Sequence, residues 1–224
     1  MKTLDKILNE FLAEVKFSRD SEVEEQLNAL FKTLEAYKDD IHQITNPIGD
    51  DTSVICELLA KILKICRDSH PDTVLVVVQS GNFHNMMVIV NYYQLEHRRE
   101  IRSGMLQILA YILSLSQTVG RQLVPTVFTV ECARDIRDSL GDANVKSEYI
   151  CSAMATFTEL LSVQEKLTVF AEEHLNQEWL TSILRYTESG TRVSFLVFLV
   201  WSLSWNLKIL KFNNVSKRVI SSFY

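Results

Sequence analysis

The chain has 224 residues, of which 47% are hydrophobic and 23% charged, and its formal net charge is −5. This size allows one large domain or two small ones, with a core that needs no disulfide or metal ion. The negative balance argues against proteins that bind nucleic acid or anionic membranes, because both normally present a basic face. Only 6 Gly and 3 Pro occur, which disfavours all-β folds and indicates helices joined by short loops.

The first half of the chain predicts four helical segments. Apolar residues recur at spacings of three and four through 4–15, which is typical of an amphipathic helix and not of a secretory signal. A second helix is expected from Ser21, with Glu24 completing a capping box, and a third after the Pro and Gly of 46–51. The valine-rich stretch that follows Pro71 favours a strand by propensity, but no other strand is expected to pair with it. We therefore expect a short buried helix that begins at Pro71 and closes at Gly81.

The second half predicts helices at every apolar stretch. They are expected at about 83–95, 98–117, 120–139, 145–163, 171–188 and 192–210, which brings the total to about ten. Helix 98–117 is apolar on more than one side and so needs neighbours in two layers. Stacked hairpins of an armadillo- or HEAT-like solenoid supply such layers, but no clean repeat is visible, so the pattern alone leaves a globular multi-helix fold open. The expected organisation is one helical domain over 1–210 and an irregular tail over 211–224.

An uncharged run of 15 residues separates Arg192 from Lys208. A membrane-spanning helix needs roughly 18–20 such residues, so the run is short for that purpose. We expect a buried helix whose covering layer is missing from this chain, as in a solenoid truncated within its stack, and a membrane anchor is the alternative.

Signatures of catalysis are absent from the sequence. It contains no GxSxG, GxGxxG, Walker or HExxH motif. The adjacent pairs Glu96–His97 and Glu173–His174 point in different directions on a helix and cannot form an acid–base pair alone. The four cysteines form no CxxC pair and are expected to be buried free thiols of a reducing, cytoplasmic compartment. We predict a protein that is not an enzyme and has no cofactor, metal ion or small-molecule substrate.

Charge and aromatic residues gather in the stretch 90–106, VNYYQLEHRREIRSGML. The basic residues lie in the first turns of the helix expected from 98, where the helix dipole favours acids. One interpretation is a solvated junction with local ion pairs. The other is an exposed basic, aromatic-edged ridge that docks an acidic partner, since interfaces favour Arg and Tyr. The candidate residues are Tyr92, Tyr93, Glu96, His97, Arg98, Arg99 and Arg102.

A second charged stretch, VECARDIRD, covers 130–138. Cys132 lies in the apolar stripe of Phe128 and Ile136, which indicates a core position and not a nucleophile. The opposite face carries Glu131, Arg134, Asp135 and Asp138. Arg134 is expected to pair with Glu131 and Asp138, at spacings of three and four residues.

Together, the two stretches resemble the leucine-rich C-terminal domain of the family of the NCK-interacting protein with SH3 domain (WISH/DIP). The family pattern is a Tyr-Tyr-Gln-x-Glu-His-Arg run followed, about thirty residues later, by Leu-Pro-x-Glu-Leu-Ala-Arg-Asp. The first run matches Tyr92 to Arg98, and the second matches Glu131, Ala133, Arg134 and Asp135, with Thr129 in place of Pro and Cys132 in place of Leu. The resemblance covers most of residues 1–190.

The resemblance implies an armadillo-like solenoid that binds and activates the actin-related protein 2/3 complex, with a linear actin filament as the product. It also implies a cytoplasmic, cytoskeleton-associated protein whose candidate partner-binding residues are those of the two stretches. Animal members of the family carry an SH3 domain and a Pro-rich segment that this sequence lacks, so binding to Nck-type adaptors through them is not expected. A generic armadillo/HEAT-type adaptor with an unrelated partner is the alternative function, and a protein anchored in a membrane by 193–207 is a weaker one.

Overall fold

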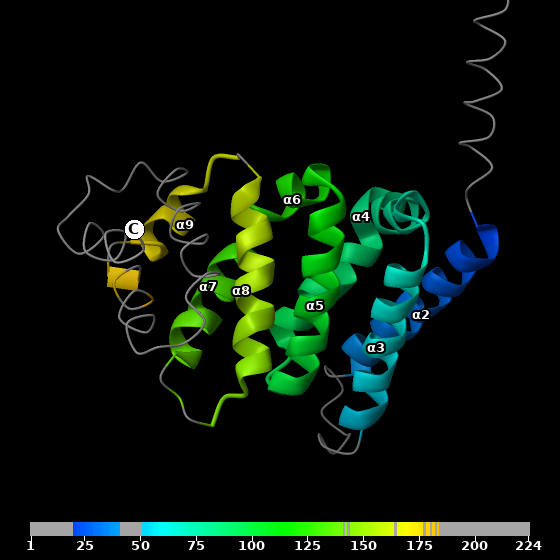
Figure 1. The fold of residues 1–224 in the computed structure, drawn as a ribbon, viewed down its shortest axis with the longest axis horizontal. Helices are drawn as coiled ribbons and strands as arrows, with labels where there is room; N and C mark the ends of the chain where they lie inside the picture. The colour runs from blue at the N-terminus through cyan, green and yellow to red at the C-terminus, as the bar shows by residue number, and fades with distance from the viewer. Residues whose placement is uncertain are drawn as a thin grey trace, which may run out of the picture. The chain divides into compact units, whose positions relative to one another are not determined.

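The computed structural model describes residues 20–40, 51–140, 142, 144–163, 165–176, 178, 179, 181 and 183. This part of the chain contains eight α-helices and no strand, so the predicted all-α class is confirmed (Figure 1). The helices are α2 (Ser21–Asp40), α3 (Thr52–Asp68), α4 (Pro71–Leu95), α5 (Arg99–Leu115), α6 (Gln117–Leu123), α7 (Val127–Ser139), α8 (Ser147–Ser162) and α9 (Val169–His174). The helices predicted at 4–15 and 192–210 and the tail 211–224 lie outside the described residues.

The chain divides into two compact units between Val119 and Gly120. The single domain expected over 1–210 stays a prediction. The first helix of the described part starts differently from the prediction. Asp20 caps α2 by accepting hydrogen bonds from the amides of Glu22 and Val23, where we had predicted a capping box from Ser21 to Glu24.

The valine-rich stretch after Pro71 is helical, as predicted, and α4 is interrupted near Gly81. Pro71 lies in the first turn, where a backbone N–H would have no partner within the helix, so the proline costs no hydrogen bond. The His70 side chain accepts a hydrogen bond from the Asp72 amide. Gly81, Asn82 and Phe83 have positive φ values of 56°, 58° and 64°. Left-handed geometry costs a residue other than Gly roughly 1–2 kcal/mol, so local bonds must hold this turn.

Asn85 supplies the main bond that holds the interruption of α4. Its side-chain amide donates to the Val77 carbonyl and to the Asn28 side chain of α2, both at 2.9 Å. The Ser80 hydroxyl also donates to the Val77 carbonyl, at 2.8 Å. A carbonyl left free by the break in the helix is thereby satisfied, and α2 is fixed against the same point.

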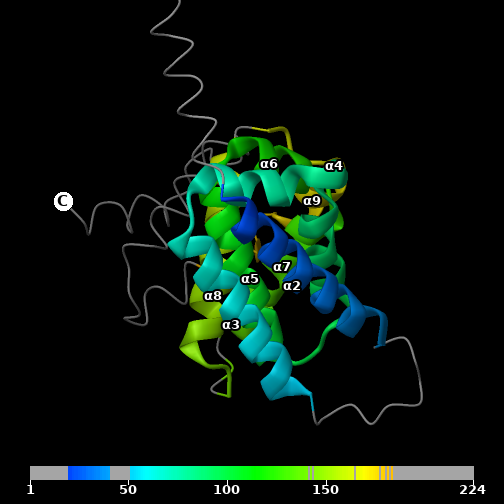
Figure 2. The ribbon, with the colours of Figure 1, turned by 90° about the vertical axis from the view of Figure 1, so that its right-hand side faces the viewer.

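Unit 1 consists of two helical hairpins that pack on each other. Helix α2 packs on α3 and α4 on α5 within the hairpins, while α2 packs on α4 and α3 on α5 between them (Figures 1 and 2). The apolar stripe of α2 is narrow, with Leu27, Phe31 and Leu34 buried, which suits a helix covered on one side. Helix α5 buries side chains around much of its circumference, as its sequence predicted.

Helices α3 and α5 run in the same direction. Arg98, just before α5, reaches Asp51 and Thr52 at the start of α3, 47 and 46 positions earlier. Further along, Gly104 of α5 faces Leu59 of α3. Equivalent helices of consecutive hairpins therefore stack in parallel at an offset within the range of roughly 40–47 residues that HEAT and armadillo repeats show.

Close packing of α3 on α5 requires a glycine at 104. A Cβ atom at this position would lie 3.0 Å from Leu59 Cδ1 and 3.2 Å from Leu59 Cβ. The flexible end of Leu59 can move away from such an atom, but its Cβ is fixed to the backbone of α3. Larger side chains at 104 would therefore push the two helices apart.

Unit 2 differs from the sequence prediction at its start. One helix was expected over 120–139, but α6 ends at Leu123 and α7 begins at Val127. Pro125 causes the break, because it has no N–H to donate and it disfavours helical geometry at the preceding residue. The buried Thr129 hydroxyl lies 3.1 Å from the Val124 carbonyl, to which it donates, and Thr126 donates to the Leu123 carbonyl. The carbonyl groups at the end of α6 and just after it thereby gain hydrogen bonds from Thr126 and Thr129.

The rest of unit 2 is a core of α7, α8 and α9. Helices α7 and α8 lie side by side (Figure 1), and α9 packs on α7. Trp179 is buried, stacks at 5.4 Å against Phe157 of α8, and donates its indole N–H to the Ala133 carbonyl of α7 at 2.8 Å. The helix predicted over 171–188 is interrupted, because α9 ends at His174 and Asn176 accepts bonds from the amides of Glu178 and Trp179.

Helix α4 is long and apolar enough to cross a membrane by length and composition alone. Its buried residues, among them Val74, Val78, Met86 and Ile89, are fully covered. Packing of α4 on α2 and α5 therefore accounts for its apolar character.

Replacing Gly104 with Val should destabilise unit 1 by about 1–3 kcal/mol, because the added side chain overlaps Leu59. Leu59→Ala alone should cost about 2–5 kcal/mol by leaving a cavity. The loss of stability in the double variant should be smaller than the sum of the two single losses. The valine at 104 would fill the space that the Leu59→Ala change leaves empty. Urea unfolding of the four proteins measures this coupling, and strictly additive losses would contradict the close α3–α5 contact.

Candidate functional site

The predicted aromatic edge of the first charged stretch is buried. Tyr92 and Tyr93 are both 0% exposed, so the interpretation of this stretch as an exposed, aromatic-edged ridge is wrong. Both side chains lie on the inner face of α4, one turn beyond the buried Ile89. The spacing of Ile89, Tyr92, Tyr93 and Glu96 follows the helical period, and this signal indicates burial from the sequence itself.

Glu96 and Arg98 form a compact ionic cluster in the turn between α4 and α5. The Glu96 carboxylate is 4% exposed and accepts hydrogen bonds from the backbone amides of His97 and Arg98, both at 2.8 Å. It also accepts from Arg98 Nε at 3.0 Å and Nη2 at 2.8 Å. The carboxylate therefore satisfies the amides of the turn that leads into α5 and holds the guanidinium at the same time.

Arg98 connects this turn to the first hairpin. Its Nη1 atom donates to Asp51 at 2.5 Å and to the Thr52 hydroxyl at 3.1 Å. One guanidinium thus binds two carboxylates that flank the starts of α3 and α5. Sequence reasoning missed Asp51 and Thr52, because only the fold brings positions this far apart in the chain together.

The pKa values of this cluster reflect both its burial and its bonds. Burial acts to raise the pKa of Glu96, but hydrogen bonds from Arg98 and the two amides outweigh it, so that pKa lies below its ordinary value. The hydrogen bond to Glu96 is the largest cause that raises the pKa of Arg98, and Asp51 adds to it. Burial raises the pKa of Tyr92, whose hydroxyl has no hydrogen-bond partner among the described residues. The cluster is thus ionised at neutral pH beside a neutral phenol.

The other residues of the first stretch are divided between packing and solvent. The Arg102 guanidinium lies 4.1 Å from the centre of the Tyr93 ring, a cation–π contact. His97 and Arg99 are exposed. The interpretation as a solvated junction with local ion pairs is therefore incomplete, because Glu96, Arg98 and Arg102 also carry structural contacts.

The second stretch lies on α7, and its apolar stripe is buried as predicted: Phe128, Cys132 and Ile136 are each 0% exposed. The predicted pairs of Arg134 are wrong, because this exposed side chain forms no ion pair with any described residue. Asp138 pairs instead with Arg137 at 2.9 Å.

The two acids of the α7 motif are less exposed than a solvated face would make them. Asp135 accepts a 2.5 Å hydrogen bond from the Tyr149 hydroxyl of α8, which ties the two helices together. Glu131 is half-buried. Of the three charged motif residues on α7, Arg134 is therefore the one whose charged group is freely available to solvent.

The prediction of four buried free thiols is only partly confirmed. All four are free thiols, and Cys66 and Cys132 are buried, but Cys56 is half-buried and Cys151 is exposed. Burial raises the pKa of Cys66 to about 12, so its thiolate is scarcely populated near neutral pH. Cys132 donates its S–H to the Ala153 carbonyl. Both buried thiols act as core residues.

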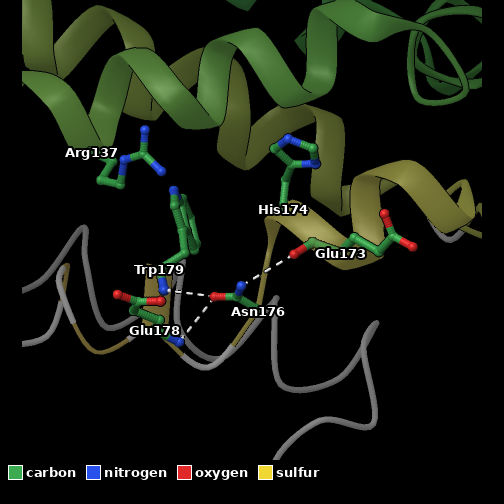
Figure 3. Close-up of a pocket in the computed structure, with 6 residues that line it drawn as sticks. All are labelled: Arg137, Glu173, His174, Asn176, Glu178 and Trp179. Atoms are coloured by element: carbon green, nitrogen blue, oxygen red, sulfur yellow. Dashed lines mark hydrogen bonds between the residues drawn. The ribbon is translucent and has the colours of Figure 1, made fainter.

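A shallow pocket of about 220 Å³ opens in unit 2 (Figure 3). Its side chains converge from α7 and from the end of α9 and the turn that follows. They are Arg137, Glu173, His174, Asn176, Glu178 and Trp179. The pocket is smaller than the roughly 300–1,000 Å³ of typical small-molecule sites. The sequence excludes Glu173 and His174 as an acid–base pair by themselves, and no sequence pattern marks the other four residues.

At least four of the pocket residues are already engaged in bonds, since Arg137 pairs with Asp138 and Trp179 donates to the Ala133 carbonyl. His174 Nδ1 lies 2.9 Å from the Phe170 carbonyl, and Asn176 caps the following turn. Within the described part of the chain, no group of three His, Cys, Asp or Glu side chains is arranged to hold a metal ion. The pocket therefore offers polar and charged contacts, with no nucleophile or metal centre among the residues that line it.

A scan of the chain against models of known protein families finds no match. The resemblance of the two motif runs to the WISH/DIP family therefore stays a prediction.

Glu96→Gln should lower the free energy of unfolding by about 1–3 kcal/mol, since it removes the charge that Arg98 and the two amides bind. Because the pKa of Glu96 is depressed in the folded chain, its contribution is present above the ordinary value of 4.5 and is lost as the pH falls through the folded value. Urea unfolding between pH 7 and pH 3 should show a flatter acid slope for the variant than for the parent. The exposed Glu57→Gln provides a matched control that should change stability by less than about 0.5 kcal/mol.

Proposed function

We propose that this chain is a non-enzymatic regulator of the actin cytoskeleton that binds and activates the actin-related protein 2/3 complex. The observation that carries the proposal is the pair of motif runs, Tyr92–Arg98 and Glu131–Asp135, at the spacing of the WISH/DIP family. The product of such activation is a linear actin filament, made without a pre-existing mother filament. The proposed location is the cytoplasm, in association with the cytoskeleton.

We further propose that the helices form an armadillo- or HEAT-like solenoid. The parallel stacking of α3 on α5 supports this, with Arg98 reaching back 47 and 46 positions. In solenoids, consecutive hairpins repeat a small rotation and create an extended surface for protein partners. Such a surface acts by binding alone and needs no catalytic residue.

The proposed mechanism is allosteric. A binding protein shifts another protein toward its active arrangement only if it binds that arrangement more tightly than the inactive one. Rigid positioning of the solenoid surface favours such selectivity. The cluster of Glu96, Arg98 and Asp51 has this role in the proposal: it fixes one hairpin on the next and so preserves the shape that the partner recognises.

An armadillo/HEAT-type adaptor with an unrelated partner is the second candidate. The stacking of the two hairpins favours it independently of the motif runs, because many protein-binding solenoids are built this way. A pull-down from cytosol separates the two. Recovery of a reproducible partner without any component of actin nucleation would favour the adaptor.

The purified chain should shorten the lag of pyrene-actin polymerisation only when the actin-related protein 2/3 complex is present. Filaments viewed by fluorescence microscopy should be linear in the absence of added seeds. Actin with the chain alone is the control and should keep its full lag. An unchanged lag at micromolar chain concentrations, together with no binding to the complex, would falsify the proposed function.

Arg134→Glu should weaken binding to the complex at least about tenfold, which corresponds to ~1.4 kcal/mol, if the α7 motif contacts it. Arg134 suits this test because it is exposed and forms no ion pair with the described residues, so its reversal leaves the fold intact. Arg98 is unsuitable, since its reversal would break the cluster with Glu96 and Asp51. The exposed Lys64→Glu on α3 is the matched control, and equal affinity of both variants would remove Arg134 from the contact surface.

A further inference from the structure

Helix α9 exposes apolar side chains at its start. Val169 is 72% and Phe170 46% exposed, while Ala171 and Leu175 on the opposite face are buried. Single exposed apolar residues are ordinary on protein surfaces, but these two are adjacent and lie on the solvent side of a helix that already has a buried face. The Phe170 ring is held in place by the His174 ring, at 4.4 Å between centroids.

Acidic side chains surround this apolar pair. Glu172 and Glu173 of the same helix are exposed and form no ion pair with any described residue. Glu173 and His174 also form one side of the pocket described above, and Glu178 contributes a further carboxylate to it (Figure 3). The one cation in the pocket lining, Arg137, is paired with Asp138 at 2.9 Å. The α9 surface, defined as Val169, Phe170, Glu172 and Glu173, is therefore both apolar and acidic.

The sequence that follows Ile183 contains a segment of complementary composition. Residues 189–224 have no Asp or Glu and carry the cations Arg192, Lys208, Lys211, Lys217 and Arg218. The uncharged run of 15 residues between Arg192 and Lys208 lies within it. The nine or so residues from Ile183 to Arg192 can span up to about 30 Å when extended, so the chain is long enough to return to α9.

We propose that the α9 surface binds the segment 192–211 of the same chain. Apolar side chains of the run pack on Val169 and Phe170, and flanking cations pair with Glu172 and Glu173. The burial of apolar area supplies most of the affinity, and the charges set the orientation of the segment. This inference does not depend on the proposed function, and it gives the apolar run a cover within its own chain, in place of a membrane or a missing layer.

A photo-cross-linker placed at position 170 tests the contact in the full chain. With p-benzoylphenylalanine in place of Phe170, irradiation should give a product of monomer mass whose cross-linked peptides map to 192–211. The same cross-linker in place of Val54, which is 49% exposed on α3, is the control and should not reach that segment. Cross-links from position 170 only to other regions, only to a second copy at dimer mass, or only to a different protein in lysate would overturn the proposal.

Charge reversal tests the pairing. The double variant Glu172→Lys and Glu173→Lys should lower the yield of the 170-to-segment cross-link about fivefold, because two surface ion pairs are replaced by repulsion. The matched control reverses Glu22 and Glu25, which are exposed on α2. Raised salt should lower the yield of the parent chain toward that of the variant. An unchanged yield in the α9 variant would contradict the ionic part of the proposal.

Discussion

The stacking of the two hairpins in unit 1 depends on one partly buried ionic contact, between Arg98 and the carboxylates of Glu96 and Asp51. Removing any one of the three leaves a charge in a place where water does not compensate it fully, which is why such clusters are costly to break. Glu96 also satisfies two backbone amides at the start of α5. Glu96 follows the end of α4, and its carboxylate bonds the turn that leads into α5. It also fixes Arg98, which reaches the preceding hairpin.

Two further features, one steric and one a hydrogen bond, also hold the helices of unit 1 in place. Gly104 permits close approach of α3 and α5, and Asn85 holds the interruption of α4 against α2. The Arg98 contact and Gly104 both restrain α3 and α5, whereas Asn85 restrains α2 and α4. The parallel offset of α3 and α5 is thus fixed by both charge and packing, and a hydrogen bond fixes α4 on α2. Together these contacts favour a surface of fixed shape over a flexible one.

Helical periodicity was sufficient to predict the fold class and the positions of α3, α5 and α8, because their apolar faces repeat every three to four residues. Local chemistry was also enough for the interruption at Gly81. The prediction of one continuous helix failed at Pro125, because a strong apolar pattern continues on both sides of the break. The prediction of exposure failed at Tyr92 and Tyr93, because their charged neighbours indicated a surface. The pairing of Arg98 with Asp51 depends on tertiary structure, so no local pattern could have revealed it.

The correction at Tyr92 and Tyr93 changes what the motif can mean for function. A run that combines aromatic and charged residues serves a partner directly only where its side chains meet solvent, and here the two rings and Glu96 do not. Under the proposed function, its matching residues act on a partner indirectly, by fixing the geometry of the hairpin stack. Under the proposed function, direct contact is left to exposed groups such as His97 and Arg134, whose loss would change affinity without changing the fold. A motif can thus identify a family through its scaffold, while specificity for the partner lies in those of its residues that stay exposed.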